Sequence, residues 1–100
     1  MAASSRRKGL KGEQEVARIL RSYGSCVKGL EAGGDWLTFY GDGREFHVEV
    51  KRHERLRLPE WVRQAESEAP AGCVPVVAYR QSREPWRVVL QLAAFMEAIR

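Results

Sequence analysis

The stretch DWLTFYGDGREFHVEVK, residues 35–51, decides the fold that we predict for this chain. Two runs rich in aromatic and β-branched residues flank a Gly-Asp-Gly loop, and this pattern is typical of a β-hairpin. In the second run, alternation places Phe46, Val48 and Val50 on one face of a strand. The other face then carries Glu45, His47, Glu49 and Lys51. A polar face of this kind is either solvated or one half of a functional site.

The flanking segments predict an α/β protein in which helices surround this hairpin. Apolar residues recur at helical spacing over residues 12–23, and Gly24 ends that predicted helix. A second helix is predicted to begin near Pro59, in the segment LPEWVRQAESEA. The other segments expected to be regular are CVKGL (26–30), CVPVVAY (73–79) and WRVVLQL (86–92) as strands and AAFMEAIR (93–100) as a helix. The expected order of elements is α-β-β-β-α-β-β-α.

Length and composition favour one globular domain that works inside the cell. The chain has 100 residues, of which 44% are apolar and 30% charged, as in an ordinary soluble domain. No apolar run approaches the ~20 residues of a membrane span, and none follows the basic start as a secretory signal would require. Cys26 and Cys73 fit no metal-ligand spacing, so we expect two buried free thiols in a reducing cytoplasm. We expect residues 1–8 to form a disordered basic arm and residues 9–100 to form the domain.

The formal net charge is +4, and basic residues gather at the start of the chain and after the predicted hairpin. Such clusters concentrate a polyanion, of which nucleic acid is the most common. Many small proteins are basic for solubility alone, so charge by itself leaves both interpretations open. The candidates for phosphate contacts are Arg6, Arg7, Lys8, Lys11, Arg52 and Arg55.

Three acidic side chains and one lysine form a possible reaction centre. Antiparallel pairing of the hairpin can bring the carboxylates of Asp35 and Glu49 side by side, where they repel unless something neutralises them. A hard divalent cation such as Mg²⁺ does so with oxygen ligands and keeps several waters for chemistry. Lys51 on the same face would stabilise a phosphorane-like transition state. With Glu13 in the first helix, these parts suffice for metal-assisted phosphodiester hydrolysis.

The same residues carry a resemblance to a known family. The pattern D-x13-E-V-K over residues 35–51 is similar to the motif of the PD-(D/E)XK nuclease superfamily. Within it, the chain resembles the archaeal-type Holliday-junction resolvases and their phage relatives. Their opening K-G-x-x-x-E is matched by KGLKGE at residues 8–13, and their Gln-Ala-Glu after the catalytic strand by residues 64–66. The resemblance covers roughly residues 7–90, with Gly34 in place of the proline in the superfamily's name.

The resemblance implies a restriction-endonuclease-like core of αβββαβ order, with a central mixed sheet flanked by helices. It implies that Asp35, Glu49 and the backbone carbonyl of Val50 bind Mg²⁺, with Mn²⁺ able to substitute. Lys51 would position the attacking water or the scissile phosphate. Glu13 would hold a metal-bound water or a second ion, and Gln64 would support the site or contact the phosphate. The implied substrate is a four-way DNA junction, cut by a homodimer in the cytoplasm of a prokaryotic or phage-infected cell.

Two other functions stay open at this level. One is a nuclease of the same superfamily that acts on flaps, single strands or duplex sites. The other is a basic DNA-binding module without catalysis. Other polar residues of these segments are interpreted as ordinary surface: Glu15, Glu45, His47 and His53. Large apolar residues are assigned to the core or to a dimer interface: Trp61, Trp86, Phe95 and Met96.

Overall fold

The predicted hairpin is confirmed by the computed structural model, which describes residues 2–28 and 36–100, with side chains from residue 11 onward in those ranges. Strands β2 (Trp36–Gly41) and β3 (Arg44–Arg52) pair antiparallel, with Trp36 directly opposite Glu49. Asp42 and Gly43 form the two-residue turn with φ angles of 53° and 76°. Positive φ at both central residues is what the twist of a two-residue hairpin requires.

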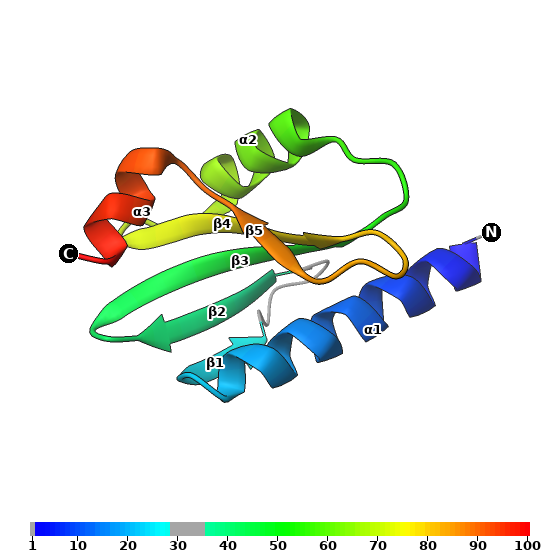
Figure 1. Ribbon diagram of the computed structural model, residues 1–100, viewed down its shortest axis with the longest axis horizontal. Helices are drawn as coiled ribbons and strands as arrows, with labels where there is room; N and C mark the ends of the chain where they lie inside the picture. The colour runs from blue at the N-terminus through cyan, green and yellow to red at the C-terminus, as the bar shows by residue number, and fades with distance from the viewer. Residues whose placement is uncertain (1, 29–35) are drawn as a thin grey trace.

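The described elements follow the predicted order. They are α1 (Ala2–Arg21), β1 (Ser25–Lys28), β2, β3, α2 (Leu58–Glu68), β4 (Cys73–Arg80), β5 (Arg87–Val89) and α3 (Leu92–Ala98). The strands form one sheet of order β1-β2-β3-β4-β5. Strands β3 and β4 are parallel and are joined through α2, whereas the other neighbours are antiparallel. The predicted α/β fold with a mixed sheet flanked by helices is therefore confirmed (Figure 1).

The sheet has a different helix on each face (Figure 1). Val48 and Val50 point to the face covered by α1, where they pack with Val16 and Ala17. On the opposite face, Val77 of β4 packs against α2 through buried aromatic and small residues, Trp61 and Ala65. Alternation along β3 therefore sends its even-numbered side chains toward α1 and its odd-numbered ones toward α2.

Helix α1 begins at Ala2, so the backbone of residues 2–8 is helical where the sequence predicted a disordered arm. The segment contains alanine, arginine and lysine, which favour helices, and no proline. Extension of a helix that is already nucleated adds one hydrogen bond per residue fixed. No helix in the described ranges is both long and apolar enough to cross a membrane.

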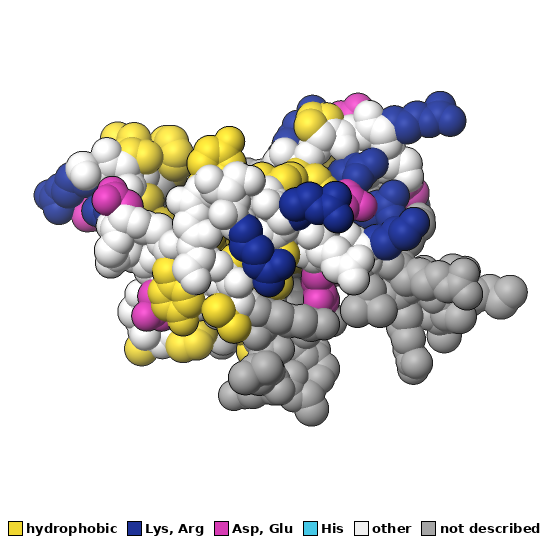
Figure 2. Space-filling model, turned by 90° about the horizontal axis from the view of Figure 1, so that it is seen from below, with side chains coloured by type: hydrophobic (Ala, Val, Ile, Leu, Met, Phe, Trp, Pro, Cys, Tyr) yellow, Lys and Arg dark blue, Asp and Glu magenta, His cyan; other side chains and the backbone are white. Residues whose placement is uncertain are grey.

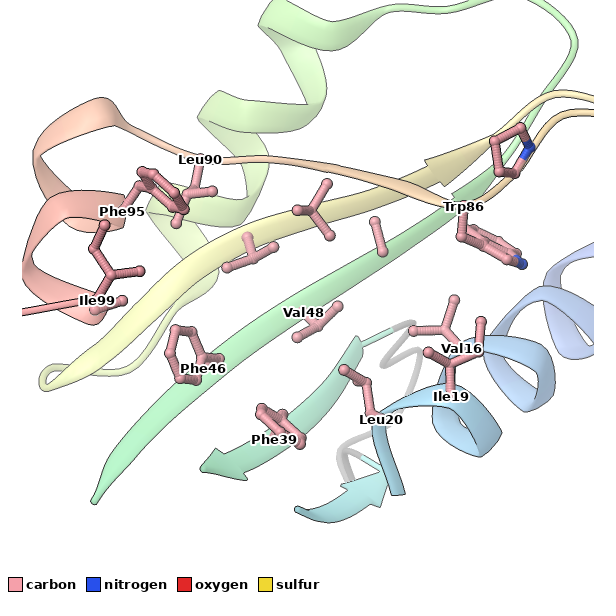
Figure 3. A pocket seen from close by; sticks show the side chains of 15 residues that line it. Val16, Ile19, Leu20, Phe39, Phe46, Val48, Trp86, Leu90, Phe95 and Ile99 are labelled. Atoms are coloured by element: carbon pink, nitrogen blue, oxygen red, sulfur yellow. The ribbon is translucent and has the colours of Figure 1, made fainter. Parts of the chain in front are cut away.

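An apolar groove with a volume of about 570 Å³ lies on the α1 face of the sheet. Figure 3 shows side chains of α1, β2 and β3 on one side of it and those of α3 on the other. Helix α3 has no buried residue of its own. The groove is lined by Val16, Ile19, Leu20, Phe39, Phe46, Val48, Val76, Ala78, Pro85, Trp86, Val88, Leu90, Phe95, Ala98 and Ile99.

Candidate metal centre

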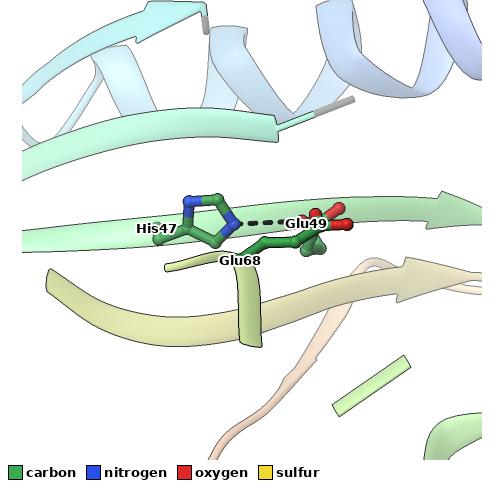
Figure 4. A group of neighbouring side chains, drawn as sticks. All are labelled: His47, Glu49 and Glu68. Atoms are coloured by element: carbon green, nitrogen blue, oxygen red, sulfur yellow. Dashed lines mark hydrogen bonds and ion pairs between the residues drawn. The ribbon is translucent and has the colours of Figure 1, made fainter. Parts of the chain in front are cut away.

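Three side chains with metal-binding atoms meet on the α2 face of the sheet (Figure 4). His47 and Glu49 come from the middle of β3 and are 2% and 0% exposed. His47 Nε2 lies 3.0 Å from Glu49 Oε1. Glu68, from the last turn of α2, supplies a carboxylate, and one donor atom from each residue lies within 4.8 Å of the others. The group could hold a metal ion.

Local structure explains why these residues meet. His47 and Glu49 are two apart on a strand, so they share a face. Trp61, Ala65 and Glu68 follow the i, i+4, i+7 spacing of one helix face, and Trp61 and Ala65 are buried against the sheet. The same stripe that packs α2 onto the sheet therefore directs Glu68 toward β3, while its place at the helix end leaves it exposed.

The electrostatics of the group favour metal binding. Burial lowers the pKa of His47, against an opposing effect of the Glu68 charge, so the imidazole is neutral at pH 7 and has a lone pair to donate. The pKa of Glu68 is lowered, first by a hydrogen bond with Glu49 and then, against the opposing effect of burial, by a hydrogen bond from Gln64 and by the charges of His47 and Lys51. The ionised form of the Glu68 carboxyl group is therefore favoured, and this is the form that binds a cation.

The structure brings several predicted site residues to this group. Glu49 is at its centre, and Lys51, half-buried, is close enough for its charge to act on Glu68. Gln64 Nε2 donates a hydrogen bond to Glu68 Oε1 at 3.3 Å. The roles predicted for these side chains stay predictions, but their proximity agrees with a common site.

Other predicted residues lie elsewhere. Glu13 is 7% exposed and is on the stripe of α1 that faces the opposite side of the sheet, and it is not a member of the group. The side chain of Val50 also lies on that side. Asp35 falls outside the described residues, and the position directly opposite Glu49 is taken by its neighbour Trp36.

The predicted phosphate contacts are only partly described. The side chains of Arg6, Arg7 and Lys8 lie outside the described part, Lys11 and Arg55 are exposed, and Arg52 is half-buried. A Cβ atom at Gly12 would lie 3.4 Å from Cβ of Arg52, so α1 near Lys11 adjoins the end of β3. Figure 2 shows Lys and Arg side chains in the middle of one face and toward the end where α2 begins.

Two residues that the sequence assigned to the ordinary surface, His47 and Glu15, are buried or hydrogen-bonded in the structure. His47 is buried beside Trp36, with 5.5 Å between the ring centroids, because helix α2 covers this face of the sheet and the parallel strand β4 pairs with the edge of β3 that a two-stranded hairpin alone would expose. Glu15 accepts hydrogen bonds from Arg80 at 2.5 Å and from Trp86 Nε1 at 2.9 Å. It therefore ties α1 to β4 and to the segment before β5.

Glu68 was not among the predicted site residues. Its helical spacing from Trp61 and Ala65 was the available signal, since a residue on that stripe must face the sheet. Comparison of the chain with models of known protein families and with curated proteins found no match. The function is therefore inferred from the geometry of the group and from the sequence motifs.

Proposed function

We propose that the protein is a metal-dependent DNA endonuclease with a restriction-endonuclease-like core, and that its preferred substrate is a four-way junction. The observation that carries the proposal is Glu49. It is fully buried at the centre of the sheet, two residues before Lys51 and beside a second carboxyl group. Burial of a carboxyl group destabilises a fold unless it is well compensated, which favours a functional reason for this residue.

The proposed chemistry divides between the ion and the chain. A bound divalent ion, Mg²⁺ by the sequence motif or Mn²⁺ in its place, would supply an acidic water and charge neutralisation at the phosphate. Glu49, together with Asp35 and the carbonyl of Val50, would hold it. Lys51 would donate hydrogen bonds to the phosphate or to the attacking water, and Gln64 would orient Glu68.

The basic residues and the apolar groove support the choice of DNA and of a homodimer. Lys11, Arg52 and Arg55 would contact phosphates near the end of β3, so that DNA shape rather than base sequence is recognised. Two symmetric cuts across a junction require two sites related by a two-fold axis. The groove next to α3 offers an apolar surface for a second copy of the chain.

The test compares Glu49→Gln with Glu45→Gln, an exposed residue on the same strand face. Each variant is incubated with a labelled four-way junction and Mg²⁺ or Mn²⁺. We expect Glu45→Gln to cut like the wild type and Glu49→Gln to lose at least 100-fold in rate, on the order of the loss of an electrostatic catalytic group. Equal cutting by both variants would overturn the assignment of Glu49.

Substrate choice is tested in the same assay. Flap, single-stranded and duplex DNA are offered beside the junction, and preference for the junction is expected. Equal cutting of all four would support a nuclease of the same superfamily with another role. Binding of the junction without cutting by the wild type, with either ion, would support a DNA-binding module instead.

A further inference from the structure

The candidate metal centre contains an imidazole, which an oxygen-only magnesium site does not need. Mg²⁺ is bound through carboxylates, phosphates and retained waters in near-ideal octahedral geometry. Imidazole nitrogen is a ligand for transition-metal ions, whose affinity for such sites rises in the order Mn²⁺, Fe²⁺, Co²⁺ and onward. His47 is held against Glu49 and is almost fully buried, so it is a built part of the centre.

We propose that His47, Glu49 and Glu68 form a binding site for a divalent transition-metal ion, and that His47 makes the site prefer Mn²⁺ and Zn²⁺ over Mg²⁺. The proposal rests on the proposed function only in that this ion would serve the same reaction: Glu49 is common to this set of ligands and to the set that the sequence motif implies. The binding site itself is independent of any substrate.

The spacing of the donor atoms supports the site. Two ligands at about 2.1 Å from an ion and at right angles to each other lie about 3 Å apart. His47 Nε2 and Glu49 Oε1 are 3.0 Å apart. The donor atoms of all three residues lie within 4.8 Å of one another, so a rotation of the Glu68 side chain completes the set. Because Glu68 is exposed, such a rotation meets solvent rather than packed atoms.

The arrangement also leaves room for reaction. His47 and Glu49 approach from the buried strand, whereas Glu68 approaches from the exposed end of α2. An ion between them would keep coordination positions open toward solvent. Catalytic sites with three protein ligands keep such open positions for water or substrate. Lys51, farther along the same strand face, would lie beside a group bound there.

The experiment measures binding of the metal alone to the full, metal-free chain. Mn²⁺ is titrated and its free concentration is followed by electron paramagnetic resonance, and then Zn²⁺ or Mg²⁺ is added as competitor. We expect one strong Mn²⁺ site that Zn²⁺ displaces and that equal concentrations of Mg²⁺ do not. His47→Ala should lower the Mn²⁺ affinity by about tenfold or more, on the order of the loss of a supporting ligand, with a much smaller change for Mg²⁺.

Two further variants keep the test decisive. Glu68→Gln should also weaken Mn²⁺ binding, whereas Glu60→Gln, an exposed residue of the same helix, should not. Circular dichroism checks that each variant is folded, and His47→Gln replaces His47→Ala if the latter unfolds. Unchanged Mn²⁺ affinity in the His47 and Glu68 variants, or displacement by Mg²⁺ as readily as by Zn²⁺, would overturn the proposal.

Failure of the metal-site proposal can be distinguished from failure of the proposed nuclease function. Tight Mn²⁺ binding that depends on His47, without cleavage of any DNA, would overturn the nuclease and leave the metal site. Cleavage that depends on Glu49, with no effect of His47 on metal preference, would overturn only the metal selectivity.

Discussion

A carboxyl group in the middle of a sheet affects both stability and activity at the level of one residue. Glu49 is fully buried and is hydrogen-bonded to His47. Glu49→Gln keeps the size of the side chain and a hydrogen bond to the imidazole, and it removes the need to bury an ionisable group. We expect the free energy of unfolding in metal-free buffer to be unchanged or raised by about 1 kcal/mol. Urea denaturation measures it, and a clear loss of stability would make the carboxyl group a structural element.

If Glu49 is a metal ligand, it also determines how a bound ion changes the stability of the fold. An ion that binds only the folded chain stabilises it by about 2.7 kcal/mol at a concentration 100 times its Kd. We therefore expect Mn²⁺ to raise the unfolding temperature of the wild type and to leave that of Glu49→Gln unchanged, since a ligand has been removed. Differential scanning fluorimetry with and without a chelator compares the two. An equal rise in both chains would place the ion elsewhere.

At the scale of elements, the turn between α1 and β1 depends on a close approach at Gly24. Its backbone N–H donates to the carbonyl of Leu20 at 3.0 Å. A Cβ atom here would lie 2.4 Å from the backbone oxygen of Tyr40 and 2.9 Å from the Phe39 ring. Gly24→Ala must therefore move backbone, and we expect it to cost about 1–3 kcal/mol of stability. At Gly43, where φ is 76°, a Cβ atom would meet no other atom within 4 Å. Gly43→Ala therefore introduces backbone strain without crowding, and in the same denaturation assay it measures the effect of that strain alone.

Glu15 gives the packing of α1 on the sheet a dependence on pH. Burial raises the pKa of Glu15, but the hydrogen bond from Trp86 and the charge of Arg80 outweigh this effect, so the pKa lies below its ordinary value of 4.5. A carboxyl group whose pKa is lower in the folded state than in the unfolded state stabilises the fold at pH values above its unfolded-state pKa. This contribution is lost as the pH falls through the folded-state pKa.

We therefore expect Glu15→Gln to be less stable than the wild type at pH 7, with a difference that shrinks as the pH is lowered below about 4.5. Glutamine can still accept the hydrogen bond from Trp86, so the variant isolates the charge. Urea denaturation over a pH series measures the difference, and Glu84→Gln, an exposed residue beyond β4, is the control. A difference that stays constant with pH would contradict the assignment.

Local patterns predicted the elements well because each depended on neighbours in the sequence. Alternation through Phe46, Val48 and Val50 and the Gly-Asp-Gly loop predicted the hairpin, and the apolar run after Cys73 predicted β4. The environment of His47 could not be predicted in this way, since it depends on α2, which covers that face, and on β4, which pairs with β3, and both elements are 11 or more residues away in the sequence. The approach of Glu68 to Glu49 likewise depends on where α2 ends relative to the sheet, a tertiary property.

At the scale of the whole molecule, hydrophobic side chains are concentrated toward one end of the long axis. They gather toward the end where α3 lies, beside Lys or Arg side chains at its tip, and further Lys and Arg side chains lie in the middle and toward the other end (Figure 2). In the groove, Val88 is 62%, Ile99 60% and Phe95 46% exposed. Contiguous apolar surface of this kind is typical of an interface between protein chains.

We expect this end to form a two-fold contact, because an isologous interface must be complementary to itself. The surface carries both an apolar groove and, beside it, an apolar helix with no buried residue of its own, so α3 of one copy can enter the groove of the other. Phe95→Asp should convert a dimer of twice 11.4 kDa into a monomer, whereas Leu56→Asp, which changes an exposed residue outside the groove, should not. Sedimentation velocity over a concentration series measures the mass. A wild-type chain that stays monomeric would contradict the dimer, and a Phe95→Asp dimer would place the contact on another surface.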